Sequence, residues 1–255
     1  MTKVIALANQ KGGVGKTTSA LNIAAGLSKN GKKILLVDLD PQANATSGSG
    51  IDEENIKKDT YDVLVGGSSM KSAILETDLY DIVPSSTALA GAEIKISQNK
   101  NKQTVLKNKL DKVKKNYDYV IIDNPPALGL LSLNSLTAAD SILIPVQAEY
   151  FALEGLAQLS ETIDLVKEHG NDKLEIEGVL MTMTSRTKLS KQVTSEVRKH
   201  FADKVYSITI PRNVRISEAP SFGKAIQDFA PLSSGARAYN KLIKEILKND
   251  KKEDN

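Results

Sequence analysis

A glycine-rich segment near the start of the chain has residue types and spacing that could hold a phosphate chain. It reads KGGVGKT over residues 11–17, between the apolar run 4–8 and a helix-like stretch from Thr18. A strand that ends in glycines and opens a helix points backbone N–H groups into one concavity, where the helix N-terminus adds partial positive charge. We expect Lys16 to reach the β- and γ-phosphates of a nucleoside triphosphate, and the Thr17 hydroxyl to ligate Mg²⁺. The nucleotide-binding residues predicted from this segment are Lys11, Gly12, Gly13, Val14, Gly15, Lys16, Thr17 and Thr18.

The segment departs from the usual phosphate-loop pattern G-x-x-x-x-G-K-[ST]. Position 10, where that pattern has glycine, is Gln10, and a second lysine, Lys11, follows it. The alternative to a phosphate site is a tight glycine turn without a ligand, and the alternative for Lys11 is a solvated loop lysine.

Carboxylates follow two of the expected strands at the points where these strands end. Asp38 ends the apolar run 33–38 and Asp40 follows it, and Asp123 closes the run 119–123. Hydrolysis of a triphosphate needs a held metal, neutralised charge and an oriented water. We therefore expect Asp123 to contact the Mg²⁺ shell, through a water or from the second shell, with a helix or turn cap as the alternative role of such residues.

The elements that must position these groups alternate along the chain. Near-continuous apolar strands are expected at 33–38, 119–123, 141–146 and 176–183, and helices at 18–29, 105–115, 130–138, 153–168, 191–201 and 236–247. Strands covered on both faces are typical of parallel sheets. The pattern predicts a three-layer α/β fold of the P-loop type, with a mostly parallel sheet flanked by helices and ligand loops at the carboxyl ends of the strands. We expect a single domain over 1–255, with a frayed tail at about 250–255.

Composition excludes several classes of function. The chain has no cysteine, which rules out thiol catalysis, disulfides and cysteine-ligated clusters. No apolar stretch approaches the ~20 residues that span a bilayer, and the N-terminus is strand-like rather than a signal peptide. We expect a soluble cytoplasmic protein.

The net charge of +3 conceals an uneven distribution. Residues 95–115 hold eight Lys and one Asp, and residues 186–255 hold 15 Lys and Arg against eight Asp and Glu. Two such segments would form a polyanion-binding face if they met in space. The alternative for 95–115 is a helix with a solvated outer face.

Three longer segments extend the pattern over nearly the whole chain. They read VDLDPQANATSG at 37–48, PVQAEYFALEG at 145–155 and IPRNVRISEAPS at 210–221. With the two-lysine loop, these segments resemble the ParA/Soj family of partitioning ATPases, whose loop is the deviant Walker A form shared with MinD. The resemblance implies that Lys11 reaches the nucleotide of a dimer partner and acts in catalysis with Lys16. It also implies that Asp40 orients the attacking water and lies near the metal's second shell.

The resemblance implies the ligands and partners as well. It predicts ATP with Mg²⁺, an ATP-dependent homodimer, non-specific binding of double-stranded DNA through Arg186 and Arg215, and a ParB-type stimulating protein. Localisation at the nucleoid and no membrane association follow from the same family. Glu149, Pro211 and Asn213 are expected near the ribose or adenine. The chain departs from the family at Asn124, where Cys or Thr is common, and at Ala43, which replaces a frequent Gly.

Three other functions fit parts of the sequence. A MinD-like membrane-associated positioning ATPase would need a membrane-inserting C-terminal helix, and the apolar stripe 242–247 lacks a following aromatic residue. A nucleotide-dependent regulator of replication or transcription would need no turnover. A biosynthetic ligase or kinase would need a dedicated small-molecule pocket, to which nothing in the sequence points.

Overall fold

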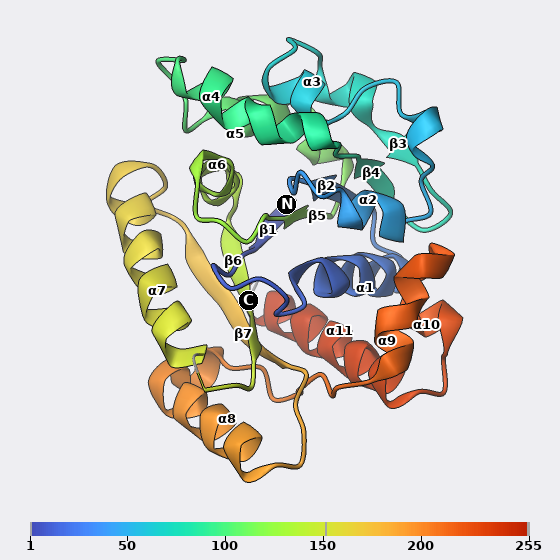
Figure 1. The fold of residues 1–255 in the computed structure, drawn as a ribbon, viewed down its shortest axis with the longest axis vertical. Coiled ribbons are helices and arrows are strands. Elements are labelled where there is room, and N and C mark those ends of the chain that lie inside the picture. The colour runs from blue at the N-terminus through green and yellow to red at the C-terminus, as the bar shows by residue number, and fades with distance from the viewer. Residues whose placement is uncertain (1, 151, 254–255) are drawn as a thin grey trace.

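The computed structural model describes residues 2–150 and 152–253, and a seven-stranded sheet runs through its centre (Figure 1). The strand order is β3-β4-β2-β5-β1-β6-β7, and among these strands only β3 and β4 pair antiparallel. The strands are β1 (Lys3–Leu7), β2 (Ile34–Asp38), β3 (Leu75–Glu76), β4 (Asp81–Val83), β5 (Tyr119–Asp123), β6 (Ser141–Gln147) and β7 (Glu175–Thr182). The predicted α/β fold with a mostly parallel sheet is confirmed.

Helices cover both faces of this sheet. They are α1 (Lys16–Lys29), α2 (Asn44–Gly48), α3 (Thr60–Leu64), α4 (Ala92–Ser97), α5 (Val105–Leu110), α6 (Leu130–Ala138), α7 (Ala152–His169), α8 (Lys188–Phe201), α9 (Val214–Glu218), α10 (Ile226–Phe229) and α11 (Ser234–Glu253). Successive residues of β1 point to opposite faces. Val4 and Ala6 pack with residues of α3 to α8, whereas Ile5 and Leu7 pack with residues of α1, α2 and α9 to α11. Burial of both faces explains why the strands are apolar throughout.

The strand order brings the expected functional segments to one edge. β2, β5 and β1 are consecutive neighbours, and Asp38 is the register partner of Asp123, which in turn is the partner of Leu7. Because all three strands are parallel, the segments that follow them leave the sheet side by side.

The C-terminal helix is attached to the opposite edge of the sheet. Asp250 of α11 forms an ion pair with Lys3 (2.6 Å) and accepts a hydrogen bond from the hydroxyl of Tyr119. Lys3 also pairs with Glu177 at 2.9 Å. The helix continues to Glu253, so it extends into the segment where the sequence predicts a frayed tail, and residues 254–255 lie outside the described part.

The two basic segments meet at one point only. α4 and α5 lie at the end of the longest axis opposite α8 (Figure 1), so these helices do not form one polyanion face with α8. The end of the first segment does approach α11 of the second: Thr2 donates to the carbonyl of Lys114, and the next residue, Lys3, pairs with Asp250.

Some helices and strands differ from those that the sequence predicts. The helix expected over 105–115 ends at Leu110 and is followed by a 3₁₀ turn, Lys114–Asn116. Five lysines lie within 107–115, and like charges three or four residues apart destabilise a continuous helix. β3, β4, α2, α3, α9 and α10 were not expected, because elements of two to five residues are too short to show a hydrophobic period.

No helix within the described ranges is both long enough and apolar enough to cross a membrane.

Candidate functional site

The glycine-rich loop joins β1 to α1 in a conformation that only glycine adopts easily. Gly13 and Gly15 have φ of 72° and 87°, and no atom lies within 4 Å of where a side chain of Gly13 would begin. Buried Val14 anchors the loop, and its carbonyl accepts a hydrogen bond from the Thr182 hydroxyl at 2.8 Å. Gly15 is the N-cap of the 14-residue α1 and supplies no side-chain cap. The hydrogen bond from Thr182 thus holds the loop in place, and the first N–H groups of α1 are available to an anion.

Lys16 lies inside this loop. Its side chain is buried, and Nζ donates to the carbonyls of Asn9 (3.1 Å) and Lys11 (3.3 Å). Burial lowers the pKa of Lys16, while the charges of Asp123 and Asp40 act in the opposite direction. The ammonium is therefore held at the centre of the loop, close to both carboxylates.

Asp38 is a structural residue of the site. It is fully buried and accepts hydrogen bonds from the backbone N–H and the hydroxyl of Thr46 (2.8 and 2.7 Å) and from the N–H of Asp40 (3.1 Å). Burial raises the pKa of Asp38 to about 6, and the bonds from Thr46 and Asp40 oppose that rise. With its oxygens occupied, Asp38 shapes the loop that carries Asp40.

Asp123 differs from Asp38 in the hydrogen bonding of its carboxylate. It is equally buried, yet neither carboxylate oxygen has a hydrogen-bond partner of normal geometry among the described residues. Burial and the neighbouring Asp38 raise its pKa well above the ordinary value, whereas Thr17 and Lys16 favour the ionised form. A buried carboxylate left without partners beside a threonine hydroxyl and a lysine fits a group that meets a cation or its waters.

The unpaired state of Asp123 makes a stability prediction. The folded state binds the Asp123 proton more tightly than the unfolded chain, in which the pKa of this carboxyl is near its ordinary value of 3.8, so ionisation of Asp123 destabilises the fold as pH rises. We expect Asp123→Asn, in metal-free protein with chelator, to raise the free energy of unfolding at pH 8 by about 1–3 kcal/mol and Tm by about 2–8 °C. Thermal melts at pH 8 and pH 5 check this, because the gain must shrink at the lower pH. A variant less stable than the parent at pH 8 would contradict it.

Asp40 stands at the rim of the same cluster. It is 7% exposed, and Oδ1 accepts a hydrogen bond from the backbone N–H of Gln42 at 2.9 Å. The turn ends at Ala43, whose φ of 53° lies in the left-handed region that favours glycine. This positive φ explains why glycine is frequent at this position in the family that the sequence resembles. Here alanine adopts the left-handed conformation instead.

The Lys11 ammonium lies near the carboxylate of Glu149. Its Nζ lies 3.8 Å from Oε2 of Glu149, and Arg212 lies 3.9 Å from Oε1 of the same carboxylate. Lys11 and Glu149 are both about half exposed. The segment 211–213 thus reaches the phosphate loop through Glu149, which brings together three regions that the sequence predicted for nucleotide binding.

Asn213 already has structural partners. Its Oδ1 accepts the N–H of Arg215 (2.9 Å) at the start of α9, and Nδ2 donates to the hydroxyl of Ser234 (2.8 Å). Contacts of Glu149, Pro211 and Asn213 with a ribose or adenine stay predictions.

Arg186 lies in the loop after Thr184, and Arg215 is the second residue of α9, which follows a neighbouring loop. The backbone of Thr184 bonds to Ile210 and Arg212, with N···O distances of 3.0 and 3.1 Å, and Thr184 is the bridge partner of Pro211. Arg186 is exposed two residues beyond Thr184, and Arg215 is exposed with Glu218 at 2.9 Å. The loops tie the two arginines to one region near the phosphate loop.

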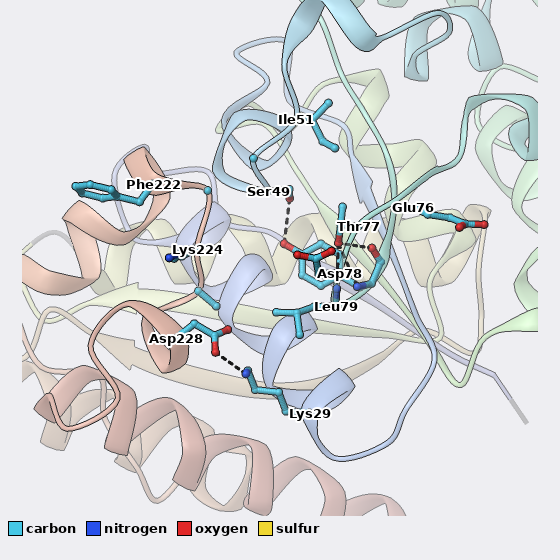
Figure 2. Close-up of a pocket in the computed structure, with 14 residues that line it drawn as sticks. Lys29, Ser49, Ile51, Glu76, Thr77, Asp78, Leu79, Phe222, Lys224 and Asp228 are labelled. Carbon is cyan, nitrogen blue, oxygen red and sulfur yellow. Dashed lines mark hydrogen bonds and ion pairs between the residues drawn. The ribbon is translucent and has the colours of Figure 1, made fainter.

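Two cavities adjoin α2. The first, about 430 Å³, is lined by Thr17, Thr18, Leu21, Asn44, Ser47, Pro220 and Ser221, so it borders the phosphate loop. The second, about 540 Å³, lies beyond α2 and has none of the predicted site residues in its wall (Figure 2). In the wall of the second cavity Gly50 meets Gly223 so closely that a Cβ on Gly223 would lie 2.6 Å from Cα of Gly50.

Residues that the sequence analysis missed support the loop. Asn9 donates to the carbonyl of Pro145 (2.7 Å) and accepts the N–H of Lys11 (3.0 Å). Buried Asn124 donates to the carbonyl of Leu7 at 3.0 Å. An asparagine directly after a strand that enters a ligand loop is a usable signal for Asn9, since its side chain can bond to the backbone two residues on.

Comparison with known proteins identifies related chains. Residues 2–176 match the family model of an AAA domain. The chain is 53% identical over 252 residues to the sporulation initiation inhibitor protein Soj of Bacillus subtilis, covering 98% of this chain and 100% of that protein. It is 47% identical over 251 residues to the chromosome partitioning protein ParA of Myxococcus xanthus, covering 97% and 89%.

Solved structures agree on the fold. The cobyrinic acid a,c-diamide synthase of Mycobacterium smegmatis, with bound ATP analogue and magnesium, superposes with a TM-score of 0.86 at 36% identity over 98% of this chain and 96% of that one. The lower identity to the synthase than to Soj and ParA places this chain nearer to the partitioning proteins.

Proposed function

Because the chain belongs to the ParA/Soj family of chromosome partitioning ATPases, we propose that it binds ATP with Mg²⁺, hydrolyses the ATP, and uses this cycle to partition DNA. The observation that carries the proposal is the group formed by Lys16, Asp40 and Asp123 around a glycine loop with free N–H groups. The residues fit both ligands: a phosphate chain suits the loop and its buried ammonium, and a cation suits the unpaired Asp123.

Each side chain has a defined part in this proposal. Lys16 neutralises charge on the phosphates, and Thr17 and Asp123 hold the Mg²⁺, directly and through its waters. The metal supplies charge neutralisation for phosphoryl transfer. Asp40, fixed by Gln42, orients the attacking water from the rim of the site.

Lys11 acts across a homodimer interface in the proposed ATP-bound state. Reaching a partner's nucleotide requires that Nζ leave Glu149, and a half-exposed ion pair at 3.8 Å is worth at most about 1 kcal/mol. The pair with Glu149 is therefore a weak contact that the proposed dimer can replace.

The proposed dimer binds double-stranded DNA without sequence preference and returns to monomers after hydrolysis. Two copies of the Arg186–Arg215 face double the phosphate contacts, so ATP switches affinity through dimerisation. A ParB-type protein stimulates turnover, and the protein works in the cytoplasm at the nucleoid.

The test of this function is duplex binding across a salt series with ATP, with ADP and without nucleotide, using Asp40→Ala to prevent turnover. Salt-dependent binding with ATP only supports the proposal, and absence of binding in every state overturns its DNA part. Turnover measured with the parent separates a cycling ATPase from a regulator that acts through nucleotide occupancy alone.

Packing of α11 argues against the MinD-like alternative. Leu242, Ile243 and Ile246 are almost wholly buried in the core cluster that includes α1. The apolar stripe is therefore occupied within the fold rather than available to a lipid surface.

Arg186 and Arg215 should contribute to DNA binding and not to nucleotide binding. We expect Arg186→Ala with Arg215→Ala to weaken duplex binding at least tenfold near physiological salt and to lower the slope of log K against log salt by about 2 for each protomer. ATP-dependent dimerisation, followed by light scattering, should be unchanged, since both side chains are exposed. Unchanged affinity at low salt would remove these residues from the DNA face.

A further inference from the structure

A second basic surface lies on α4, α5 and the turns around them, far from Arg186 and Arg215. We call it the α4–α5 lysine surface, and its members are Lys95, Lys100, Lys102, Lys107, Lys109, Lys112, Lys114 and Lys115. Figure 1 places α4 and α5 at the end of the molecule opposite α8, and α9 is also remote from them. The proposed function uses none of these residues.

The acidic groups in this region are already engaged. Asp111, the one carboxylate of residues 95–115, lies between Lys107 (2.7 Å) and Lys114 (2.6 Å). Glu93, at the start of α4, accepts the backbone N–H of Leu131 at 3.0 Å. Asp111 offsets one of the eight lysine charges, so residues 95–115 keep a large positive excess.

Four of the lysines remain available. Lys95 lies over the ring of Tyr61, and Lys109 donates to the carbonyl of Ser68 at 2.8 Å. By contrast, the ammonium groups of four exposed residues form no hydrogen bond or ion pair with the described part of the chain: Lys100, Lys102, Lys112 and Lys115. These side chains can reach outward to a ligand that carries several negative charges.

The surface has the composition of a phosphate-binding site rather than of a protein interface. Interface cores are enriched in aromatic residues and arginine and depleted in lysine. Here Ile94 is the only large apolar side chain of α4 and α5 that is mainly exposed, and the segment 95–115 has no arginine. Lysines act as flexible point charges toward phosphate, and phosphate contacts need no fixed sequence register.

We propose that the α4–α5 lysine surface is a second contact surface for the sugar-phosphate backbone of duplex DNA, separate from the Arg186–Arg215 face. The inference rests on the proposed DNA binding of this protein. Because the two surfaces lie at opposite ends of the protomer, one dimer offers DNA contacts at four places, and it can hold two duplexes or two distant segments of one.

The experiment compares two charge-matched triple variants of the full chain in the Asp40→Ala background. Lys100→Gln, Lys102→Gln and Lys112→Gln remove three lysines of the surface. Lys167→Gln, Lys173→Gln and Lys244→Gln remove three exposed lysines elsewhere and serve as the matched control. The measurement is binding of a random-sequence duplex with ATP across a salt series, together with capture of a labelled duplex by an immobilised one.

We expect the surface variant to lower the slope of log K against log salt by about 2 to 3 per protomer and to reduce duplex capture at least fivefold, while the control variant behaves as the parent. Equal slopes for the two variants would overturn the proposal. Loss of binding to vesicles with anionic lipids, with DNA binding unchanged, would also overturn it and assign the surface to a membrane. If the Asp40→Ala parent binds no duplex, the proposed function fails. If the parent binds duplex and the surface variant binds it equally well, only the second contact surface is overturned.

Discussion

Lys16→Ala should raise the Kd for ATP at least about a hundredfold. The ammonium is buried at the centre of the loop and contacts the loop carbonyls of Asn9 and Lys11. Removing one partner of a buried, charge-assisted contact with a phosphate costs about 2–5 kcal/mol, which accounts for that factor. Titration with a fluorescent ATP analogue, read with and without Mg²⁺, measures the effect.

Two controls show whether the loss is specific. Lys33→Ala removes an exposed lysine at the far edge of the sheet and should leave the Kd unchanged. Thermal melting without nucleotide should show a folded Lys16→Ala protein, because burial already disfavours the charged form of Lys16, as its lowered pKa indicates. An ATP affinity of Lys16→Ala within threefold of that of the parent would contradict the assignment of the phosphate loop.

Asp40→Ala should separate binding from turnover. We expect kcat for ATP hydrolysis to fall about 10²- to 10³-fold, with the Kd for ATP changed less than threefold, because Asp40 lies at the rim and is proposed to act on the water rather than on the phosphates. The ATP-bound dimer then accumulates and stays on DNA. Single-turnover hydrolysis and size-exclusion chromatography with ATP measure the two effects.

Asp40→Asn is the matched variant for this prediction. It retains an oxygen that can accept the N–H of Gln42, and it removes the negative charge. Loss of turnover in both variants assigns the effect to the carboxylate, whereas loss in Asp40→Ala alone assigns it to the shape of the turn. Parent-like turnover in Asp40→Ala would show that another group orients the water.

Sequence was sufficient where the pattern is long or the chemistry is specific. β5 and α6 begin and end where the sequence predicts, because a fully buried strand and an apolar helical run that starts directly after Gly129 leave clear boundaries. The grouping of Lys16 with Asp40 and Asp123 also followed, since three adjacent parallel strands end at one edge.

Sequence was insufficient where the answer depends on which segments meet. The charge excess of 95–115 and that of 186–255 could be counted, but only the topology shows that α4 and α5 lie far from α8. The same limit applies to the contacts of Glu149 with Lys11 and Arg212, because they join three loops distant in sequence. Nothing in the order of residues distinguishes Asp38, with its bonds to Thr46, from the unpaired Asp123.

The attachment of α11 beside Lys3 has a practical meaning for imaging this protein. Asp250 lies near the first residues of β1 and β5, so a fluorescent reporter fused beyond it would start about one strand length, roughly 17 Å, from the edge that carries the phosphate loop. A reporter placed there keeps clear of the nucleotide and of the loops of Arg186 and Arg215. Fusions at this end are thus the rational choice for following the protein in living cells.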